Sequence, residues 1–356
     1  MNEAGFFILS CRKIKSTMKK ILLIIFAAIL LLVAYAAWSL FGPTISAPEG
    51  KYFYIHTGAT YDEVKEQLNE QKIIKSVFFF DRLSKQVKYN TRIKPGRYEI
   101  KDGMSLVKLV RMLKAGNQSP VRFVINKIRT KEDLAGKIGQ QFEVDSTEVI
   151  NFLTSNDSLA PYHVDTNTVM TIIIPNSYML WWNSSLKNII KRLNTQKELF
   201  WEGKRTVKAA AMNLTPDQVY TMASIVEEET NKQDDKGLIA SVYLNRINKG
   251  MKLEADPTVK YAMRNFALKR ILHGHLQYPS LYNTYLHTGL PPGPIATPSI
   301  NTIDAVLDAP KTDYLFFVAK PDFSGYSNFA SSYQEHLVFA KAYQRALDSL
   351  LISRNK

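Results

Sequence analysis

The chain has 356 residues, enough for two modest domains and an anchor, and its apolar content of 46% and charged content of 22% are ordinary for a globular protein. Its formal net charge of +14 is not ordinary and indicates an acidic partner, such as nucleic acid, anionic lipid or a carboxylate-bearing polymer. We expect no nucleic-acid partner, because no zinc-finger, recognition-helix or aromatic RNA-binding signature accompanies the charge. The single cysteine, Cys11, precedes the long apolar segment, which excludes a disulfide framework and a thiol nucleophile in the rest of the chain.

Residues 21–41 are predicted to cross the plasma membrane once as a helix. Ile21 to Trp38 is an uninterrupted run of 18 apolar or aromatic residues, long enough to span a bilayer. Five cationic residues crowd its N-terminal side, which predicts that residues 1–20 are a cytoplasmic tail and that everything beyond the anchor is extracytoplasmic. These cations are Arg12, Lys13, Lys15, Lys19 and Lys20. A cleaved signal peptide is the alternative; the run is longer than a typical signal-peptide core and ends in bulky residues, so we favour a retained anchor.

A linker at 42–50, rich in proline and small residues, leads to a compact unit predicted at 51–127. A capping box at Thr60 and Glu63 begins one helix, and Gly116 is suited to end another. The predicted elements are strands at Tyr52–His56 and Arg97–Lys101 and helices from Thr60, around Phe78–Ser84 and at Ser105–Lys114.

Residues 128–356 are predicted to form a second, larger domain, which gives the whole chain an α+β fold class. The expected helices lie at Lys131–Phe142, Thr147–Leu153 and Ser185–Trp201, and an apolar strand is expected at Thr171–Ile174. The aromatic residues Tyr178, Trp181 and Trp182 follow that strand. They are suited either to stacking on sugar rings or to a place in the core.

One helix, beginning at Thr215, carries the residues with the clearest chemistry. Thr215 is a good N-cap and Pro216 fits the first helical position. The residues that define its buried stripe are Val219, Met222, Ala223 and Val226. Projection at helical spacing places Glu229 at the edge of this stripe. Burial against apolar side chains favours the neutral form of a carboxylate, which is what a general acid needs near neutral pH.

The two preceding glutamates project differently from the same helix. Glu227 falls off the stripe, and Glu228 points nearly opposite to it, so we expect Glu228 to lie on a solvated face. Glu227 is kept as the alternative catalytic residue.

Three blocks of sequence, covering roughly 221–319, carry a family resemblance. They read "MASIVEEET", "IASVYLNRINKGMKLEADPTVKYAM" and "YNTYLHTGLPPGPIATPSINTIDAVLDAPKTDYLFFVA". They are similar to the signature of the MltG-type (YceG-like) endolytic murein transglycosylases, which usually have lysine at the position of Glu228. The later glutamate of that pattern is the catalytic acid/base of the family and corresponds to Glu229. More weakly, "IKPGRYEIKDGMSLVKLVRMLKAG" resembles the LysM-like, glycan-binding module at the front of these proteins.

The resemblance implies an endolytic peptidoglycan lytic transglycosylase that acts on nascent glycan strands during cell-wall assembly. Glu229 would protonate the glycosidic oxygen between N-acetylmuramic acid and N-acetylglucosamine and then accept the proton of the muramic C6 hydroxyl as a 1,6-anhydro ring closes. Water is not the nucleophile, so neither a second carboxylate nor a cofactor is required. The implied partners are peptidoglycan strands, the plasma membrane and penicillin-binding proteins.

The substrate-binding residues expected in the cleft are Asn245, Asp256, Thr258, Tyr282, Asn283 and Tyr285. The resemblance implies the first three, although Asp256 and Thr258 are equally suited to starting a helix. The other three combine amide and hydroxyl groups with aromatic faces, a mixture suited to sugars. Gly289 and Gly293 bound a rigid loop whose backbone could approach a ligand closely.

Metal binding, a muramidase and a non-catalytic scaffold are the alternatives to a lytic transglycosylase. His273 and His275 lie in a loop without cysteine or a clear third ligand, so no metal site is assigned. A hydrolytic muramidase would need a second carboxylate in the cleft, for which Glu227, Glu254 and Asp256 are the residues to inspect. A non-catalytic peptidoglycan-binding scaffold would leave Glu229 without effect.

Overall fold

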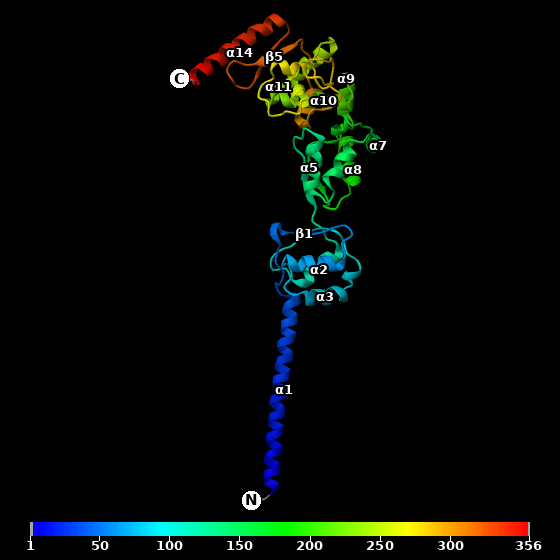
Figure 1. The fold of residues 1–356 in the computed structure, drawn as a ribbon, viewed down its shortest axis with the longest axis vertical. Helices are drawn as coiled ribbons and strands as arrows, with labels where there is room; N and C mark the ends of the chain where they lie inside the picture. The colour runs from blue at the N-terminus through cyan, green and yellow to red at the C-terminus, as the bar shows by residue number, and fades with distance from the viewer. Residues whose placement is uncertain (1–2, 355–356) are drawn as a thin grey trace. The chain divides into compact units, whose positions relative to one another are not determined.

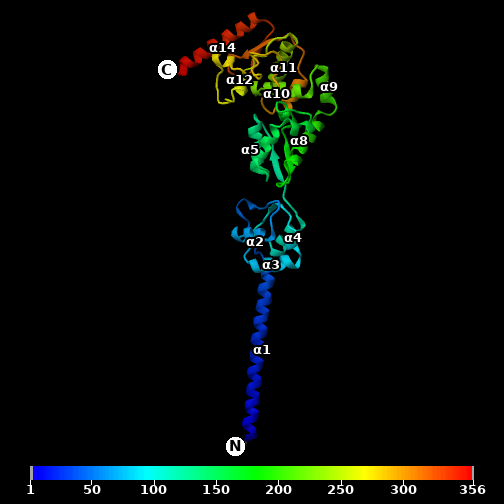
Figure 2. The same cartoon turned by 45° about the vertical axis from the view of Figure 1, so that its right-hand side comes forward.

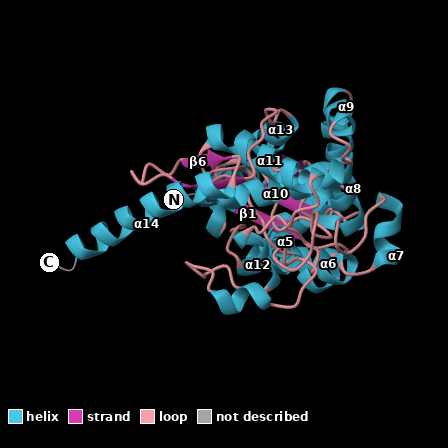
Figure 3. Ribbon diagram, turned by 90° about the horizontal axis from the view of Figure 1, so that it is seen from above, coloured by secondary structure: helices cyan, strands magenta, loops and turns pink. Residues whose placement is uncertain are grey.

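A computed structural model describes the backbone of residues 3–354 and the side chains of residues 17–350. By their contacts these residues form two compact units. The smaller unit extends to Pro120 and includes Trp181–Asn183, and the larger unit contains Val121–Leu180 and the chain from Ser184 onward. Helices make up most of the chain and the strands are short (Figure 3). The mixed helix and strand composition agrees with the α+β prediction.

A single long helix, α1 (Glu3–Phe41), begins the described chain (Figure 1). The helix therefore starts well before Ile21, within the expected cytoplasmic tail; residues 1–2 of that tail lie outside the described residues. Its segment Thr17–Phe41 has 25 residues and is long and apolar enough to cross a membrane. The apolar side chains of this segment are mostly exposed, as a lipid-facing helix requires. The expectation of one N-terminal apolar helix is confirmed.

The smaller unit pairs strands β1 (Tyr52–Ile55) and β2 (Gly96–Glu99) antiparallel. Its helices are α2 (Tyr61–Glu70), α3 (Val77–Gln86) and α4 (Leu106–Ala115). The order strand, helix, helix, strand, helix is the one predicted from the sequence. The core side chains are Phe53, Ile55, Leu68, Phe80 and Leu109, all fully buried. Trp182 packs edge-on against Tyr54 and His56.

In the larger unit, β3 (Val121–Val124) pairs antiparallel with β4 (Ser177–Leu180). The helices around this pair are α5 (Lys131–Gln141), α6 (Ser146–Leu153), α7 (Asn156–Leu159), α8 (Leu186–Trp201) and α9 (Lys204–Ala211). The strand expected at Thr171–Ile174 is wrong. Residues Val169–Ile172 form a buried single turn of 3-10 helix, and the strand begins at Ser177 because its partner β3 pairs there.

The remainder of the larger unit is built around helix α10 (Pro216–Glu229). It contacts α11 (Gln233–Asn248), α12 (Asp256–Ala262) and α13 (Ile300–Leu307), and Figure 2 shows α10, α11 and α12 together. Strands β5 (Phe316–Ala319) and β6 (Ser327–Ala330) form an antiparallel hairpin that contacts the last helix, α14 (Tyr333–Arg354). Every residue from 219 to 226 of α10 is buried, so this helix passes through the core.

Candidate active site

Helix α10 places three consecutive glutamates where it leaves the core. Its start is fixed locally, because Thr215 and Gln218 form a capping box and Pro216 occupies the first helical position. Its buried middle fixes the helix against its neighbours, and Thr230 ends it in extended conformation. The three carboxylates are therefore held on a rigid element, but each has a different environment.

Glu229 faces a buried phenol. The Tyr243 hydroxyl, on α11, donates a hydrogen bond of 2.7 Å to Glu229 Oε1. Tyr243 is almost completely buried and packs edge-on against Phe317 of β5. The Glu229 side chain keeps part of its surface accessible, so a ligand can reach it while protein surrounds most of the carboxyl group.

Burial raises the pKa of Glu229 from 4.5 to about 7. The hydrogen bond from Tyr243 opposes this rise because it stabilises the charged form. The negative charge of Asp256 raises the pKa further, and the positive charge of Lys260 lowers it. Glu229 is therefore a carboxyl group that can both give and take a proton near neutral pH.

Helix α12 and the loop that follows it form the other side of this site. Asp256, exposed at the first position of α12, accepts a hydrogen bond of 2.7 Å from the Tyr285 hydroxyl. Burial raises the pKa of Tyr285, and the carboxylate of Asp256 adds to the rise, so the phenol stays protonated and donates. The structure brings Asp256 and Tyr285, two of the residues expected in the cleft, into the electrostatic surroundings of Glu229.

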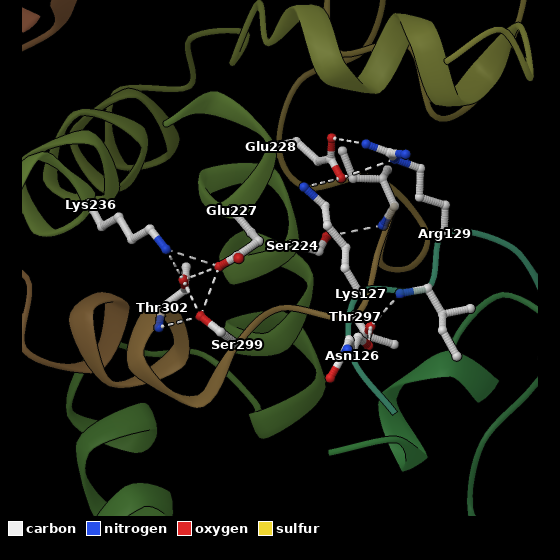
Figure 4. Close-up of polar contacts among 12 residues, drawn as sticks. Asn126, Lys127, Arg129, Ser224, Glu227, Glu228, Lys236, Thr297, Ser299 and Thr302 are labelled. Atoms are coloured by element: carbon white, nitrogen blue, oxygen red, sulfur yellow. Dashed lines mark hydrogen bonds and ion pairs between the residues drawn. The ribbon is translucent and has the colours of Figure 1, made fainter. Parts of the chain in front are cut away.

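Glu227 points away to a buried cation on α11. Lys236 Nζ lies 3.1 Å from Glu227 Oε2, and Ser299 and Thr302 both donate hydrogen bonds to the same oxygen (Figure 4). Burial alone would raise the pKa of Glu227, but the hydrogen bonds from Thr302 and Lys236 outweigh it and hold the pKa below its ordinary value. An ionised, fully partnered carboxylate is suited to joining α10, α11 and α13 rather than to giving a proton.

The expectation that Glu228 lies on a solvated face is wrong. Arg129 donates to both of its oxygens, at 3.1 and 3.0 Å, and Lys127 Nζ lies 2.7 Å from Oε1. Figure 4 shows Glu228 turned toward Arg129 and Glu227 turned toward Lys236. The helix projection failed here because the segment after β3 covers this face of α10. Glu228 is a side chain that fixes that segment.

The segment 293–299 is bonded to α10 at two residues, Ile295 and Ser299. Ser224 Oγ accepts a hydrogen bond of 3.0 Å from the Ile295 amide, and Thr297 bonds to the segment after β3, at Ile128 (Figure 4). A Cβ on Gly293 would lie 2.1 Å from the carbonyl oxygen of Asn167. The close approach at Gly293 is thus to the protein's own backbone, not to an open ligand site as expected.

Three of the expected substrate residues have their polar atoms satisfied inside the protein. The Thr258 hydroxyl is buried and bonds to Ala255 and Thr284. The Asn283 amide is buried and donates to the carbonyls of Leu276 and Tyr278. The Asn245 amide donates to the carbonyls of Thr312 and Tyr314, at 2.9 Å each. Because Asn245 and Tyr243 are two positions apart on α11, they face nearly opposite directions. These three residues hold loops in place.

A cavity of about 700 Å³ in the larger unit does not contain Glu229. It is lined by residues at the start of α10, such as Gln218, and by the loop at Leu290. Gln218 and Glu229 are eleven positions apart, roughly 16 Å along a helix. Glu229 is the candidate catalytic residue, because its raised pKa and its hydrogen bond from Tyr243 suit general acid–base chemistry.

Sequence reasoning missed Tyr243 and Lys260 as members of the site. Both are ordinary helix residues in the sequence, and Tyr243 reaches Glu229 only because α11 folds back onto α10. The tyrosine does fall within the block "IASVYLNRINKGMKLEADPTVKYAM", so its position in the signature was the available signal.

A glutamate with a near-neutral pKa, reachable from solvent and held by a buried phenol, is the arrangement that general acid–base catalysis uses. The chain belongs to the YceG-like family, whose model matches residues 53–342. A structural relative, the crystal structure of a putative yceG-like protein from Listeria monocytogenes, covers 80% of this chain and 97% of its own, with a TM-score of 0.53 and 26% identity.

Curated relatives are proteins named endolytic murein transglycosylase. The one from Bacillus subtilis is 39% identical over 154 residues, covering 43% of this chain and 42% of its own length. The one from Streptococcus pneumoniae R6 is 26% identical over 321 residues, covering 79% of this chain and 56% of its own. The chain therefore matches about half the length of these relatives.

Proposed function

We propose that this protein is an endolytic peptidoglycan lytic transglycosylase, with Glu229 as its catalytic acid and base. The observation that carries the proposal is the environment of Glu229, a half-buried residue whose carboxyl pKa is raised to about 7 and whose Oε1 accepts a hydrogen bond from Tyr243. The names of the relatives, endolytic murein transglycosylase, support the same reaction.

In the proposed reaction, protonated Glu229 gives its proton to the oxygen that links N-acetylmuramic acid to N-acetylglucosamine, and the bond from that oxygen to the muramic C1 breaks. The resulting carboxylate takes the proton of the muramic C6 hydroxyl while its oxygen bonds to C1. The products are a 1,6-anhydro-muramic end and a free N-acetylglucosamine end, and Glu229 regains its proton. One carboxyl group suffices for both steps. Because Tyr243 occupies Oε1, the proton is transferred at Oε2.

Asp256, Tyr282 and Tyr285 remain the proposed substrate-binding residues. Asp256 is exposed and Tyr285 is partly accessible, so both can meet a sugar next to Glu229. Asp256 is also the carboxylate that a hydrolytic muramidase would use, because its charge acts on Glu229. Asp256→Asn therefore separates the two reactions: a transglycosylase keeps forming anhydro ends, whereas a muramidase loses its base.

The test of the proposal is Glu229→Gln, which keeps size and hydrogen bonding but removes the titrating proton. We expect cleavage of peptidoglycan strands to fall by roughly four orders of magnitude or more, at or above the top of the usual range for general acid–base catalysis. Glu148→Gln is the control, because Glu148 is an exposed glutamate in the first turn of α6 and has no part in the proposed site. A Glu229→Gln protein that cleaves at the native rate would remove the proposed mechanism.

The apolar helix and the smaller unit complete the proposal. The cations before Ile21 support a single-pass plasma-membrane protein with a cytoplasmic N-terminus and an extracytoplasmic catalytic domain. If a reporter that works only in the cytoplasm is fused at Lys356 and proves active, this topology is contradicted. We further propose that the smaller unit, with its strand-helix-helix-strand order, is a LysM-like glycan-binding domain, and that the enzyme acts on nascent strands beside penicillin-binding proteins.

A further inference from the structure

A small cavity at the far end of α12 has an unusual concentration of hydrogen-bond donors. Its volume is about 220 Å³, and its lining joins α5, the loop before β4 and the chain after α12. The lining residues that matter here are Lys131, Arg264, Tyr261, Tyr282 and Ser280. Tyr261 lies five positions after Asp256, so the cavity is about 8 Å along α12 from the residue beside Glu229.

Lys131 is a half-buried cation without a carboxylate partner in the part of the chain that the structure describes. Its Nζ donates to the backbone carbonyl of Thr166 at 3.0 Å. The nearest acidic groups, Glu132 and Asp165, act on it only at a distance. Asp165 Oδ1 already accepts hydrogen bonds from the Asn167 and Thr168 amides. A half-buried ammonium group without a counter-charge is costly, because desolvation is not repaid.

A second cation faces the same space. Arg264 stacks over the Tyr261 ring, and its closest acidic partner is Glu132, at 3.8 Å on the exposed side. Burial lowers the pKa of Lys131, the charges of Glu132 and Asp165 oppose this, and the charge of Arg264 lowers the pKa further. Lys131 and Arg264 therefore repel each other. An anion between them would remove both costs.

Two neutral phenols also line the cavity. Tyr261 and Tyr282 lie with ring centroids 4.8 Å apart, and burial raises the pKa of both phenols, so they remain protonated. A planar anion with two oxygens matches a guanidinium, an ammonium and a phenol placed together. The cavity is too small for a sugar chain but sufficient for one short acidic side group.

We propose that this cavity binds a carboxylate of the peptide that substitutes the glycan strand, with Lys131 and Arg264 as its charged partners and the Tyr261 hydroxyl as a donor. The proposal rests on the proposed function, since it names a part of the same substrate. It makes the enzyme selective for strands whose peptides carry free carboxylates near the cleavage point, and it gives the positive charge of this region a specific role.

The experiment measures binding rather than cleavage. Full-length Glu229→Gln protein in detergent is titrated calorimetrically with a soluble disaccharide-peptide fragment of peptidoglycan, with the same fragment after amidation of its carboxylates, and with the free peptide. Lys131→Met is then added to this background, and Lys137→Met, on the same helix but outside the cavity, is the control. Thermal melting verifies that each variant is folded, and Arg264→Gln replaces Lys131→Met if that variant does not fold.

We expect Lys131→Met to weaken binding of the carboxylate-bearing fragment roughly ten- to hundred-fold, the value of a hydrogen bond to a charged group. Lys137→Met should leave the affinity unchanged, and the amidated fragment should bind weakly to every variant. If the free peptide and the fragment bind equally, the peptide carboxylate alone is recognised. If the fragment binds more tightly, the cavity recognises a peptide carboxylate that is attached to the glycan. Unchanged affinity in both Lys131→Met and Arg264→Gln, or equal affinity for the amidated fragment, overturns the proposal. Because the protein used is already Glu229→Gln, this result does not depend on whether Glu229 is catalytic.

Discussion

Glu227 and Glu229, two positions apart on α10, have opposite electrostatic environments. Lys236, Ser299 and Thr302 all contact Glu227 and keep it ionised. Glu229 has no cation within ion-pair distance among the described residues, and a single phenol bonds to it. The backbone therefore presents two chemically identical groups, and their neighbours make one of them structural and the other able to exchange a proton near pH 7.

The hydroxyl of Tyr243 should tune this proton exchange. In Tyr243→Phe the ring stays packed on Phe317, but the carboxylate loses its donor, so the pKa of Glu229 should rise. The alkaline limb of kcat/KM against pH, which reports loss of the acidic proton, should move to higher pH. The maximal rate should fall roughly ten- to hundred-fold if the hydrogen bond also orients the carboxyl group. A lower rate with an unmoved alkaline limb would mean that Tyr243 acts only on the fold.

The raised pKa of Glu229 also predicts how stability depends on pH. Because the pKa rises from 4.5 to about 7 on folding, the folded state binds the proton more tightly. This contribution is complete below pH 4.5 and is lost as pH increases through 7. Glu229→Gln has no such loss, so at about pH 9 it should be more stable than the native protein, by at most on the order of 3 kcal/mol. Near pH 4.5 the two proteins should melt alike. If the difference in melting temperature between Glu229→Gln and the native protein is the same at both pH values, the burial of Glu229 is contradicted.

The sequence predicts Glu229 as the catalytic residue but does not predict its surroundings. The glutamate follows a local pattern, since capping residues set the register of α10 and the family signature marks the same position. Tyr243, Lys260 and Arg129 come from three other segments, and only the packing of those segments places them near α10. The same limitation explains why Asn283 and Thr258 were expected in the cleft although their polar atoms are used internally.

At the scale of elements, α10 differs from the amphipathic helix that its sequence suggests. Residues 219–226 are all buried, including Ser224 and Thr221, so α10 has no solvated face over this stretch. Its polar side chains bond to backbone instead, Thr221 to Asp217 and Ser224 to Thr221. A projection that assumes one exposed face therefore cannot place Glu228, which is covered from the opposite side.

The junction of α10, α11 and α13 depends on the Glu227–Lys236 pair. Glu227→Gln leaves the buried ammonium of Lys236 without a counter-charge, so we expect a loss of about 3 kcal/mol in the free energy of unfolding of the larger unit. Below the melting transition, the folded protein should retain its rate of cleavage to within a few-fold. Urea unfolding and activity on the same samples test this. Loss of activity without loss of stability would return Glu227 to the catalytic role that was its alternative.

Helix ends were predictable where the signal is local. Thr60, Ser105, Thr130 and Thr215 all accept a hydrogen bond from the third residue of the helix that follows. The conformation of Thr171–Ile174 was not predictable, because an apolar run of that length suits a strand or a buried turn equally. Its outcome was decided by where β3 pairs with β4, which brings together residues about 55 positions apart, as in Arg122 and Ser177.

In the whole molecule, the smaller compact unit includes the apolar helix, and the larger unit contains the glutamates of α10. The connection between the units is not a single linker, because Trp181–Asn183 belong to the smaller unit while the chain on both sides belongs to the larger one. In the sequence, only the pair Trp181 and Trp182 marks this return of the chain. In the structure Trp181 is exposed and Trp182 is buried.

A division of binding and chemistry between the two units can be tested by deletion. Removal of residues 51–120 spares β3, which begins at Val121. If the smaller unit is LysM-like, the shortened protein should sediment less with insoluble peptidoglycan, while cleavage of soluble fragments persists and proves that the larger unit is folded. Sedimentation equal to that of the full chain would identify the smaller unit as a spacer.

In the proposed reaction, Glu229 recovers its proton from the C6 hydroxyl of the substrate rather than from water. Mass spectrometry of the glycan ends after digestion tests it most directly. We expect the native protein to produce 1,6-anhydro-muramic ends, which are lighter by one water than hydrolytic ends. Glu229→Gln should produce neither kind of end. Reducing muramic ends from the native protein, and their loss in Asp256→Asn, would contradict it and identify a water-using muramidase.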